Sequence, residues 1–149
     1  MNSRVVAVAS LLATVCLAGC RDGVEQKPVA PAAGTITCEG EPVVNASILF
    51  NPISEGKSAI VGRQAYANSD VNGEFVLTTY GNEDGAVIGK HSVVVSLDSK
   101  NPCDCFAVDT VPVMVFEIKK GEKNVIDIVL PKKTGREQKE RRSSSDDDE

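Results

Sequence analysis

Aromatic and histidine side chains are scarce in this sequence. It contains no tryptophan, two tyrosines, four phenylalanines and one histidine in 149 residues. A core built from this chain must therefore be mainly aliphatic, and one histidine cannot form the imidazole clusters on which many catalytic and metal sites depend. An excess of basic residues is also missing, because the formal net charge is −5. An acidic chain without a basic face argues against nucleic acid as a partner.

Long hydrophobic runs are missing as well. The main apolar stretch, residues 5–17, is shorter than the roughly 20 residues that a membrane-spanning helix requires. It follows Arg4 and ends just before Cys20, so residues 1–19 are typical of a secretory signal peptide. The letters LAGC at its end resemble the lipobox of bacterial lipoproteins, which implies that Cys20 is acylated and becomes the first mature residue. The alternative is an ordinary secretory signal with an accidental cysteine.

Acylation of Cys20 would make the membrane a partner of this protein. Each buried methylene contributes about 0.8 kcal/mol, and more than one acyl chain gives stable anchoring. The sequence therefore predicts an extracytoplasmic, membrane-anchored lipoprotein. Arg21 rather than an aspartate follows the cysteine. By resemblance to lipoprotein sorting rules, this favours the outer membrane, on the periplasmic side or at the cell surface.

Composition divides the rest of the chain into three segments. Residues 20–33 are rich in Pro and Ala and lack periodicity, which indicates a tether behind the anchor. Residues 132–149 are highly charged and contain no aliphatic side chain, which predicts a disordered tail. Docking of that tail on a charged surface is the alternative. Residues 34–131 remain for one domain of modest size.

The segment 34–131 has the pattern of an all-β domain. Short β-branched and aliphatic runs recur between Gly, Pro, Asn and Asp, and no helical periodicity is sustained. Some runs alternate clearly, since Ile126, Ile128 and Leu130 share one face. This pattern predicts a seven-stranded antiparallel β-sandwich. The seven runs are residues 35–38, 43–50, 63–69, 74–80, 90–97, 112–118 and 124–130.

Two stretches in the middle of the chain combine acids with glycine. In SDVNGEF, the pair Asn72-Gly73 predicts a tight hairpin turn with positive φ angles, and the spacing does not fit an EF-hand calcium loop. In GNEDGAVIG, the acids Glu83 and Asp84 lie between glycines. They are either solvated loop carboxylates or, with backbone carbonyls, the ligands of a weak calcium site.

Three stretches together resemble a known domain family. GTITCEGEPVVNASILFNP, SDVNGEF and DGAVIGKHSVVV are similar to the carboxypeptidase regulatory-like domain, over residues 34 to about 97 and more loosely through FEIKKGEKNVIDIVLP. The resemblance implies a transthyretin-like (prealbumin-like) sandwich, which is also the globular part of many small bacterial lipoproteins. The matching positions are mainly turn and core residues, so the resemblance implies a fold and no catalytic residues. Transthyretin-like hydrolases of 5-hydroxyisourate use several His and Arg residues and a C-terminal YRGS signature. This chain has only one His and no YRGS sequence.

The single histidine, His91, lies at a strand start in phase with Val93 and Val95. This phase indicates a hydrogen-bonded residue at the edge of the core. A catalytic base is the alternative, but the chain contains no G-x-S-x-G elbow. A Ser-His-Asp arrangement is recognised only by geometry, so the sequence leaves it open.

The cysteines Cys38, Cys103 and Cys105 remain after removal of the signal peptide. Alternating strand directions place Cys38 at the same end as the CDC turn, and an oxidising compartment favours disulfides. We therefore expect Cys38 to pair with Cys103 or Cys105, leaving one free thiol. A site for a soft cation such as Cu(I), or for zinc, is the alternative. His91 would lie roughly 20 Å from that site, at the opposite end of the domain.

These features predict a non-catalytic, lipid-anchored structural or binding module of the bacterial cell envelope. No cofactor is expected. The partners would be the membrane, through the lipid, and an envelope protein or glycan. The alternative is a metal-handling or hydrolytic protein centred on the turn between Cys103 and Cys105.

Overall fold

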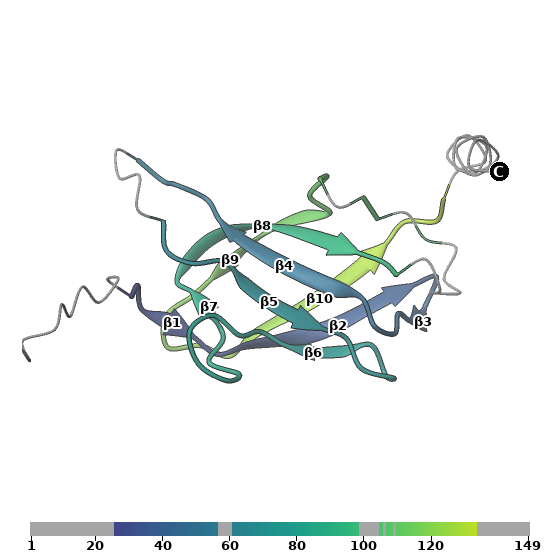
Figure 1. Cartoon of the computed structure of the whole chain (residues 1–149), viewed down its shortest axis with the longest axis horizontal. Coiled ribbons are helices and arrows are strands. Elements are labelled where there is room, and N and C mark those ends of the chain that lie inside the picture. The colour runs from purple at the N-terminus through teal and green to yellow at the C-terminus, as the bar shows by residue number, and fades with distance from the viewer. Residues whose placement is uncertain (1–25, 57–60, 99–104, 106, 109, 134–149) are drawn as a thin grey trace, which may run out of the picture.

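The computed structural model of the chain shows an all-β domain (Figure 1). None of the residues that it describes is helical, so none belongs to a helix that is long and apolar enough to cross a membrane. The signal segment, Cys20, Cys103 and the charged tail beyond residue 133 lie outside the described part. The described residues are 26–56, 61–98, 105, 107–108 and 110–133.

Two four-stranded sheets and a two-stranded ribbon make up this domain. We call the four-stranded sheets the β2 sheet and the β4 sheet. The β2 sheet contains β10 (Asn124–Leu130), β2 (Ala32–Cys38), β3 (Glu41–Pro42) and β6 (Glu74–Val76). The β4 sheet has the order β5 (Ala65–Asn68), β4 (Ser47–Pro52), β8 (Gly89–Ser96) and β9 (Met114–Ile118). The ribbon pairs β1 (Val29–Ala30) with β7 (Ala86–Val87).

The core lies between the inner faces of the two sheets and is aliphatic, as the scarcity of aromatic residues requires. Burial alternates along the strands, and β10 is the clearest case because every second residue from Asn124 to Leu130 is buried. Phe50 is the largest side chain without any exposed surface. The other large core side chains are Ile36, Ile48, Leu77, Ile118, Ile126, Ile128 and Leu130.

The prediction of seven strands, all antiparallel, is wrong in two respects. The described residues form ten strands, because β1, β3 and β7 have only two residues each and are too short to give a periodic pattern. In addition, β10 runs parallel to β2, with Ile128 opposite Ile36 (Figure 1). The cause is the turn after β9, which carries the chain from the β4 sheet to the β2 sheet. The chain still reverses its direction at this turn, so β10 runs the same way as β2. Because β10 pairs with β2 and not with β9, the resulting pair is parallel.

Asn124 stabilises this crossing between the sheets. Its side-chain amide donates to the carbonyl oxygens of Pro31 and Lys119 at 3.1 and 3.2 Å, and its Oδ1 accepts from the N–H of Lys119 at 2.8 Å. Its backbone N–H also donates to the Pro31 oxygen. One buried side chain therefore joins the end of β9 to the start of β2.

The folded part begins earlier than the predicted boundary at residue 34. The ribbon strand β1 and the first residues of β2 come from the segment 20–33, which the composition assigns to a tether. At the other end, Lys132 forms a β-bridge with Cys105, just beyond residue 131. The last third of the expected tether is thus part of the sandwich.

Candidate functional site

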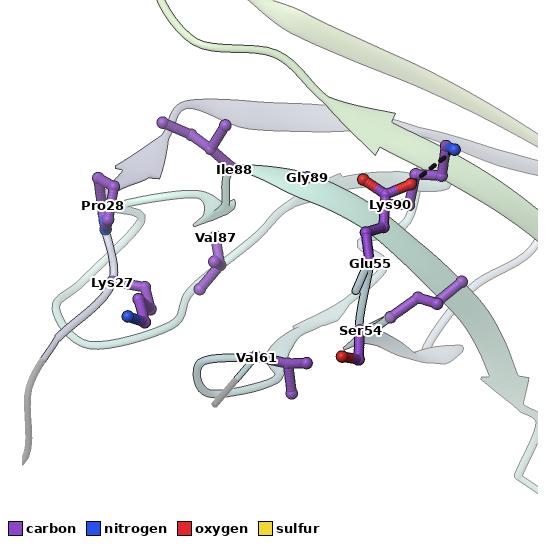
Figure 2. A pocket seen from close by; sticks show the side chains of 10 residues that line it. Lys27, Pro28, Ser54, Glu55, Val61, Val87, Ile88, Gly89 and Lys90 are labelled. Atoms are coloured by element: carbon purple, nitrogen blue, oxygen red, sulfur yellow. Dashed lines mark ion pairs between the residues drawn. The ribbon is translucent and has the colours of Figure 1, made fainter. Parts of the chain in front are cut away.

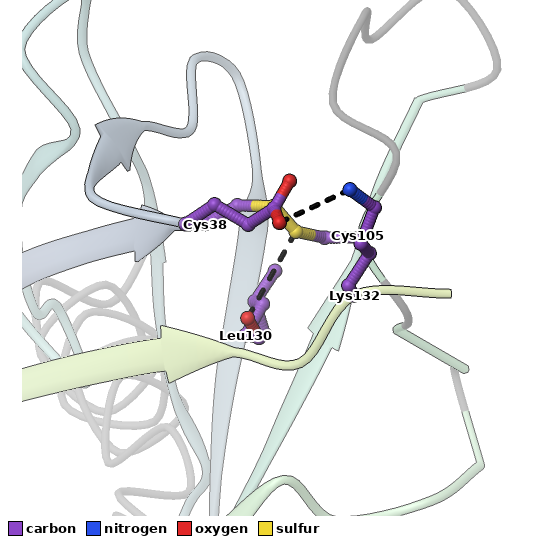
Figure 3. A network of polar contacts seen from close by, with 5 residues as sticks. Cys38, Cys105, Leu130 and Lys132 are labelled. Carbon is purple, nitrogen blue, oxygen red and sulfur yellow. Dashed lines mark hydrogen bonds and ion pairs between the residues drawn. A yellow bond between two sulfur atoms is a disulfide. The ribbon is translucent and has the colours of Figure 1, made fainter. Parts of the chain in front are cut away.

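A disulfide between Cys38 and Cys105 links the end of β2 to the loop before β9 (Figure 3). The two Cα atoms are 6.1 Å apart, and both residues are buried. Cys105 reaches this position through its antiparallel bridge to Lys132, and its Sγ lies 3.9 Å from the Leu130 oxygen. The prediction that Cys38 pairs with one of the two later cysteines is confirmed, and the partner is Cys105.

An ion pair near the disulfide joins the residue after β2 to the segment after β10. Lys132 Nζ donates to Glu39 Oε1 at 3.1 Å, and more than half of each side chain is exposed (Figure 3). An exposed pair of this kind contributes at most about 1 kcal/mol. The covalent crosslink, rather than the ion pair, therefore holds this end of the sandwich together.

The disulfide uses two of the three sulfur atoms that the metal alternative needs. A disulfide offers no thiolate, and thiolates are the ligands that bind Cu(I) and zinc. Cys103 lies outside the described residues. In the part of the chain that the structure describes, no three His, Cys, Asp or Glu side chains are grouped so that they could hold a metal ion.

His91 is fully buried in β8, between Pro52 of β4 and Phe116 of β9 in the strand register. Its Nε2 lies 2.7 Å from the Val87 oxygen, so this nitrogen carries the proton and donates. Its Nδ1 has no hydrogen-bond partner among the described atoms, and the ring packs against Phe50 with centroids 5.8 Å apart. The predicted hydrogen-bonded histidine is confirmed, and it lies deeper than the core edge.

His91 and the disulfide lie at opposite ends of the sandwich, as the strand directions predict. Gly89, at the start of β8, is opposite Ile118 at the end of β9. The next strand, β10, begins beside Ala32 and ends beside Cys38. The histidine and the sulfur atoms therefore do not form a common site.

The loop between β6 and β7 is organised by the carboxylate of Asp84. Its Oδ1 accepts from the N–H of Thr79 at 2.7 Å, and its Oδ2 accepts from those of Tyr80 and Gly81 at 3.0 and 2.8 Å. Burial is the largest single influence on the pKa of Asp84 and raises it. The N–H donors of Thr79, Gly81 and Tyr80 together outweigh burial, so the pKa is lower than the ordinary 3.8.

This geometry gives the calcium hypothesis no set of oxygen ligands. The Asp84 oxygens face the positive ends of three N–H dipoles, whereas a calcium site surrounds the cation with oxygen atoms. Glu83 is exposed and lies in the left-handed region with φ 53°, and its N–H donates to Thr78 Oγ1 at 3.0 Å. The expectation of a solvated carboxylate holds for Glu83 and is wrong for Asp84, because Asp84 binds the backbone.

The turn in SDVNGEF is closed by a second aspartate, Asp70. Its Oδ1 accepts from the N–H groups of Asn72 and Glu74, both at 2.8 Å, and its carbonyl accepts from Gly73. Only Gly73 of the predicted pair has a positive φ, of 74°. The turn is therefore confirmed, but its expected two-residue hairpin form is wrong. It connects β5 of the β4 sheet to β6 of the β2 sheet.

A cleft of about 340 Å³ lies beside the β1–β7 ribbon (Figure 2). Lys90 and Glu55 form an ion pair of 2.6 Å on one side of it, and Val87 is drawn between this pair and Lys27. Glu55 raises the pKa of Lys90, first by its hydrogen bond and then by its charge. The Lys90 ammonium is thus already neutralised within the protein. The cleft is lined by Lys27, Pro28, Ile53, Ser54, Glu55, Val61, Val87, Ile88, Gly89 and Lys90.

Sequence reasoning missed this cleft because its walls come from four separate segments. Lys27 falls in the expected tether, and no motif connects it to Glu55 or Lys90.

Comparison with protein-family models, with curated proteins and with solved structures finds no match to this chain. The functional argument therefore depends on the residues and their geometry.

Proposed function

We propose that this protein is a lipid-anchored, non-catalytic structural or binding module of the bacterial cell envelope. The sequence LAGC after the apolar run carries the proposal, since acylation of Cys20 would attach the chain to a membrane. Residues 21–25 are the only link between Cys20 and the first described residue, Gln26. Even fully extended, this link keeps the domain within roughly 20 Å of the anchor.

The disulfide supports the extracytoplasmic part of the proposal. Structural disulfides persist in oxidising compartments and are rare where thiol reductants are abundant. Cys38 and Cys105 are buried, and the bond between them crosslinks the end of β2 to the loop before β9. Such a bond is compatible with the periplasm or the cell surface, which are the compartments that an anchored Cys20 would imply.

The side chains that could perform catalysis are buried or already bonded within the protein, and this supports the proposal that the protein is not an enzyme. A catalytic base must reach its substrate, and His91 has no exposed surface. The Asp84 carboxylate already accepts three backbone hydrogen bonds, and the sulfur atoms of Cys38 and Cys105 are bonded to each other. Each of these groups is used to hold the fold.

The finer fold assignment, a transthyretin-like sandwich of the carboxypeptidase regulatory-like type, belongs to the same proposal. Positions that carry the resemblance have structural roles in this chain. A Cβ atom at Gly34 would lie 1.8 Å from the Ile126 oxygen, so only glycine fits between β10 and β6. Gly73 adopts the positive φ that closes its turn, and Asp84 binds the loop before Gly85.

Replacing Cys20 with Ser tests the proposal. The variant should move from the membrane fraction to the soluble fraction of cells, because a hydroxyl cannot receive the lipid. Cys16→Ser is the matched control, since it removes a cysteine from the same leader segment outside the LAGC letters and should leave the protein on the membrane. A Cys20→Ser variant that stays on membranes after a salt wash would show that the protein is not lipid-anchored.

A further inference from the structure

The sandwich has one long strand edge without a partner, on β10. Among the described strands, β10 pairs only with β2, along its whole length from Asn124 to Leu130 (Figure 1). The other edge strands of the β2 sheet, β3 and β6, have only two and three residues, and β3 contains Pro42. The edge of β5 is closed, because Tyr66 and Thr78 exchange two backbone hydrogen bonds of 2.9 Å.

The remaining edge strand, β9, is shorter than β10, and its exposed acid already has a lysine opposite it. Its exposed acid Glu117 lies opposite Lys90 in the strand register, and its charge raises the pKa of that lysine. On β10, the corresponding acid is Asp127. Its Oδ1 accepts a 3.0 Å hydrogen bond from Thr35 Oγ1, and it forms no ion pair with a described lysine or arginine.

The exposed face of β10 combines apolar and acidic character. Val125 and Val129 are 68% and 70% exposed, and Asp127 lies midway between them. Glu74 of β6 is placed across Thr35 from Asp127, so two carboxylates share one row of the sheet. This row attracts a cation, while the valines on either side favour apolar neighbours.

A second copy of this chain is a poor match for the edge. In a symmetric antiparallel pairing of two β10 strands centred on Asp127, the two Asp127 carboxylates would lie opposite each other. Like charges directly opposite in a sheet are destabilising. A shift by two residues would instead place Asp127 opposite a valine, which leaves the carboxylate without a cation. The pattern therefore favours a partner of different sequence.

We propose that β10 binds an extended segment of a partner protein as an additional strand of the β2 sheet. The segment carries Lys or Arg beside Asp127 and an apolar residue two positions away on each side. Backbone hydrogen bonds supply the affinity in this mode of recognition, and alternate side chains supply the specificity. The inference rests on the binding role within the proposed function and does not depend on the lipid anchor.

The test uses the purified lipoprotein in detergent and two synthetic peptides, acetyl-TVTKTVT-amide and acetyl-TVTETVT-amide. Binding is measured by titration, from the shifts of the protein's backbone amide NMR signals. The lysine peptide should shift amides of residues 124–130 and bind about fivefold more tightly than the glutamate peptide, which is about 1 kcal/mol. Asp127→Lys should reverse this preference, because it changes the charge on the exposed face of β10.

Glu117→Lys on β9 is the matched control and should leave the peptide preference unchanged. Shifts that concentrate on β9, a preference that Asp127→Lys does not reverse, or no shift at millimolar peptide would each overturn the proposal. None of these outcomes involves Cys20. A protein that fractionates with membranes but ignores the peptides would therefore refute the β10 site and leave the lipid anchor standing.

Discussion

The disulfide should be the largest single contribution to the stability of this domain. Cys38 and Cys105 are separated by 67 positions in the sequence. The loop-entropy relation for a crosslink of this span gives about 4 kcal/mol of stabilisation at 25 °C. Since whole domains are stable by only about 5–15 kcal/mol, removal of the bond should take away a large part of the total.

The double variant Cys38→Ala/Cys105→Ala measures this contribution. Alanine is preferred to serine because both positions are buried and a hydroxyl there would need a new partner. Urea unfolding followed by far-UV circular dichroism should show a midpoint well below that of the oxidised wild type. Cys103→Ala is the control and should retain the bond and the wild-type midpoint. A double variant within about 1 kcal/mol of wild type would refute the crosslink argument.

Two further predictions concern the loops and the sheet. Asp84→Ala should lower the free energy of unfolding in urea by about 1–3 kcal/mol, and Glu83→Ala should lower it by less than about 0.5 kcal/mol. Because the folded-state pKa of Asp84 lies below 3.8, the part of this cost that depends on its charge is present above about pH 4 and should be lost as the pH falls through that pKa. A cost that does not change with pH would contradict this prediction. Gly34→Ala should lower the free energy of unfolding by more than about 3 kcal/mol. Gly121→Ala should lower it by only about 1 kcal/mol, because the added Cβ meets open space there and only the positive φ of 77° is unfavourable. Equal effects of the two substitutions would contradict the close approach of Gly34 to Ile126.

Strand periodicity predicted the all-β class and the inner faces of the longest strands. Ile126, Ile128 and Leu130 alternate in the sequence and are all buried. The pairing of β10 with β2 was not predictable, because the turn between Ile118 and Asn124 has the composition of a hairpin, which would place β10 beside β9. A local sequence does not reveal that the chain there crosses from one sheet to the other.

For the candidate site, the sequence predicted at which end of the domain each residue lies, but it did not predict the individual contacts. Strand directions placed Cys38 near the CDC turn and His91 far from both, and the registers agree. The choice of Cys105 over Cys103 depends on the bridge to Lys132, which is a tertiary contact without a local signal. The role of Asp84 was missed for the same reason, because three N–H groups converge on it only after the loop has folded.

The intact mass of the protein extracted from membranes tests the central claim most directly. Lipid anchoring predicts that the mature chain begins at Cys20 and carries covalently attached acyl groups on that residue. Fragmentation of the same sample should place the added mass on the first residue. A chain that begins elsewhere, or an unmodified Cys20 in the membrane fraction, would contradict the account.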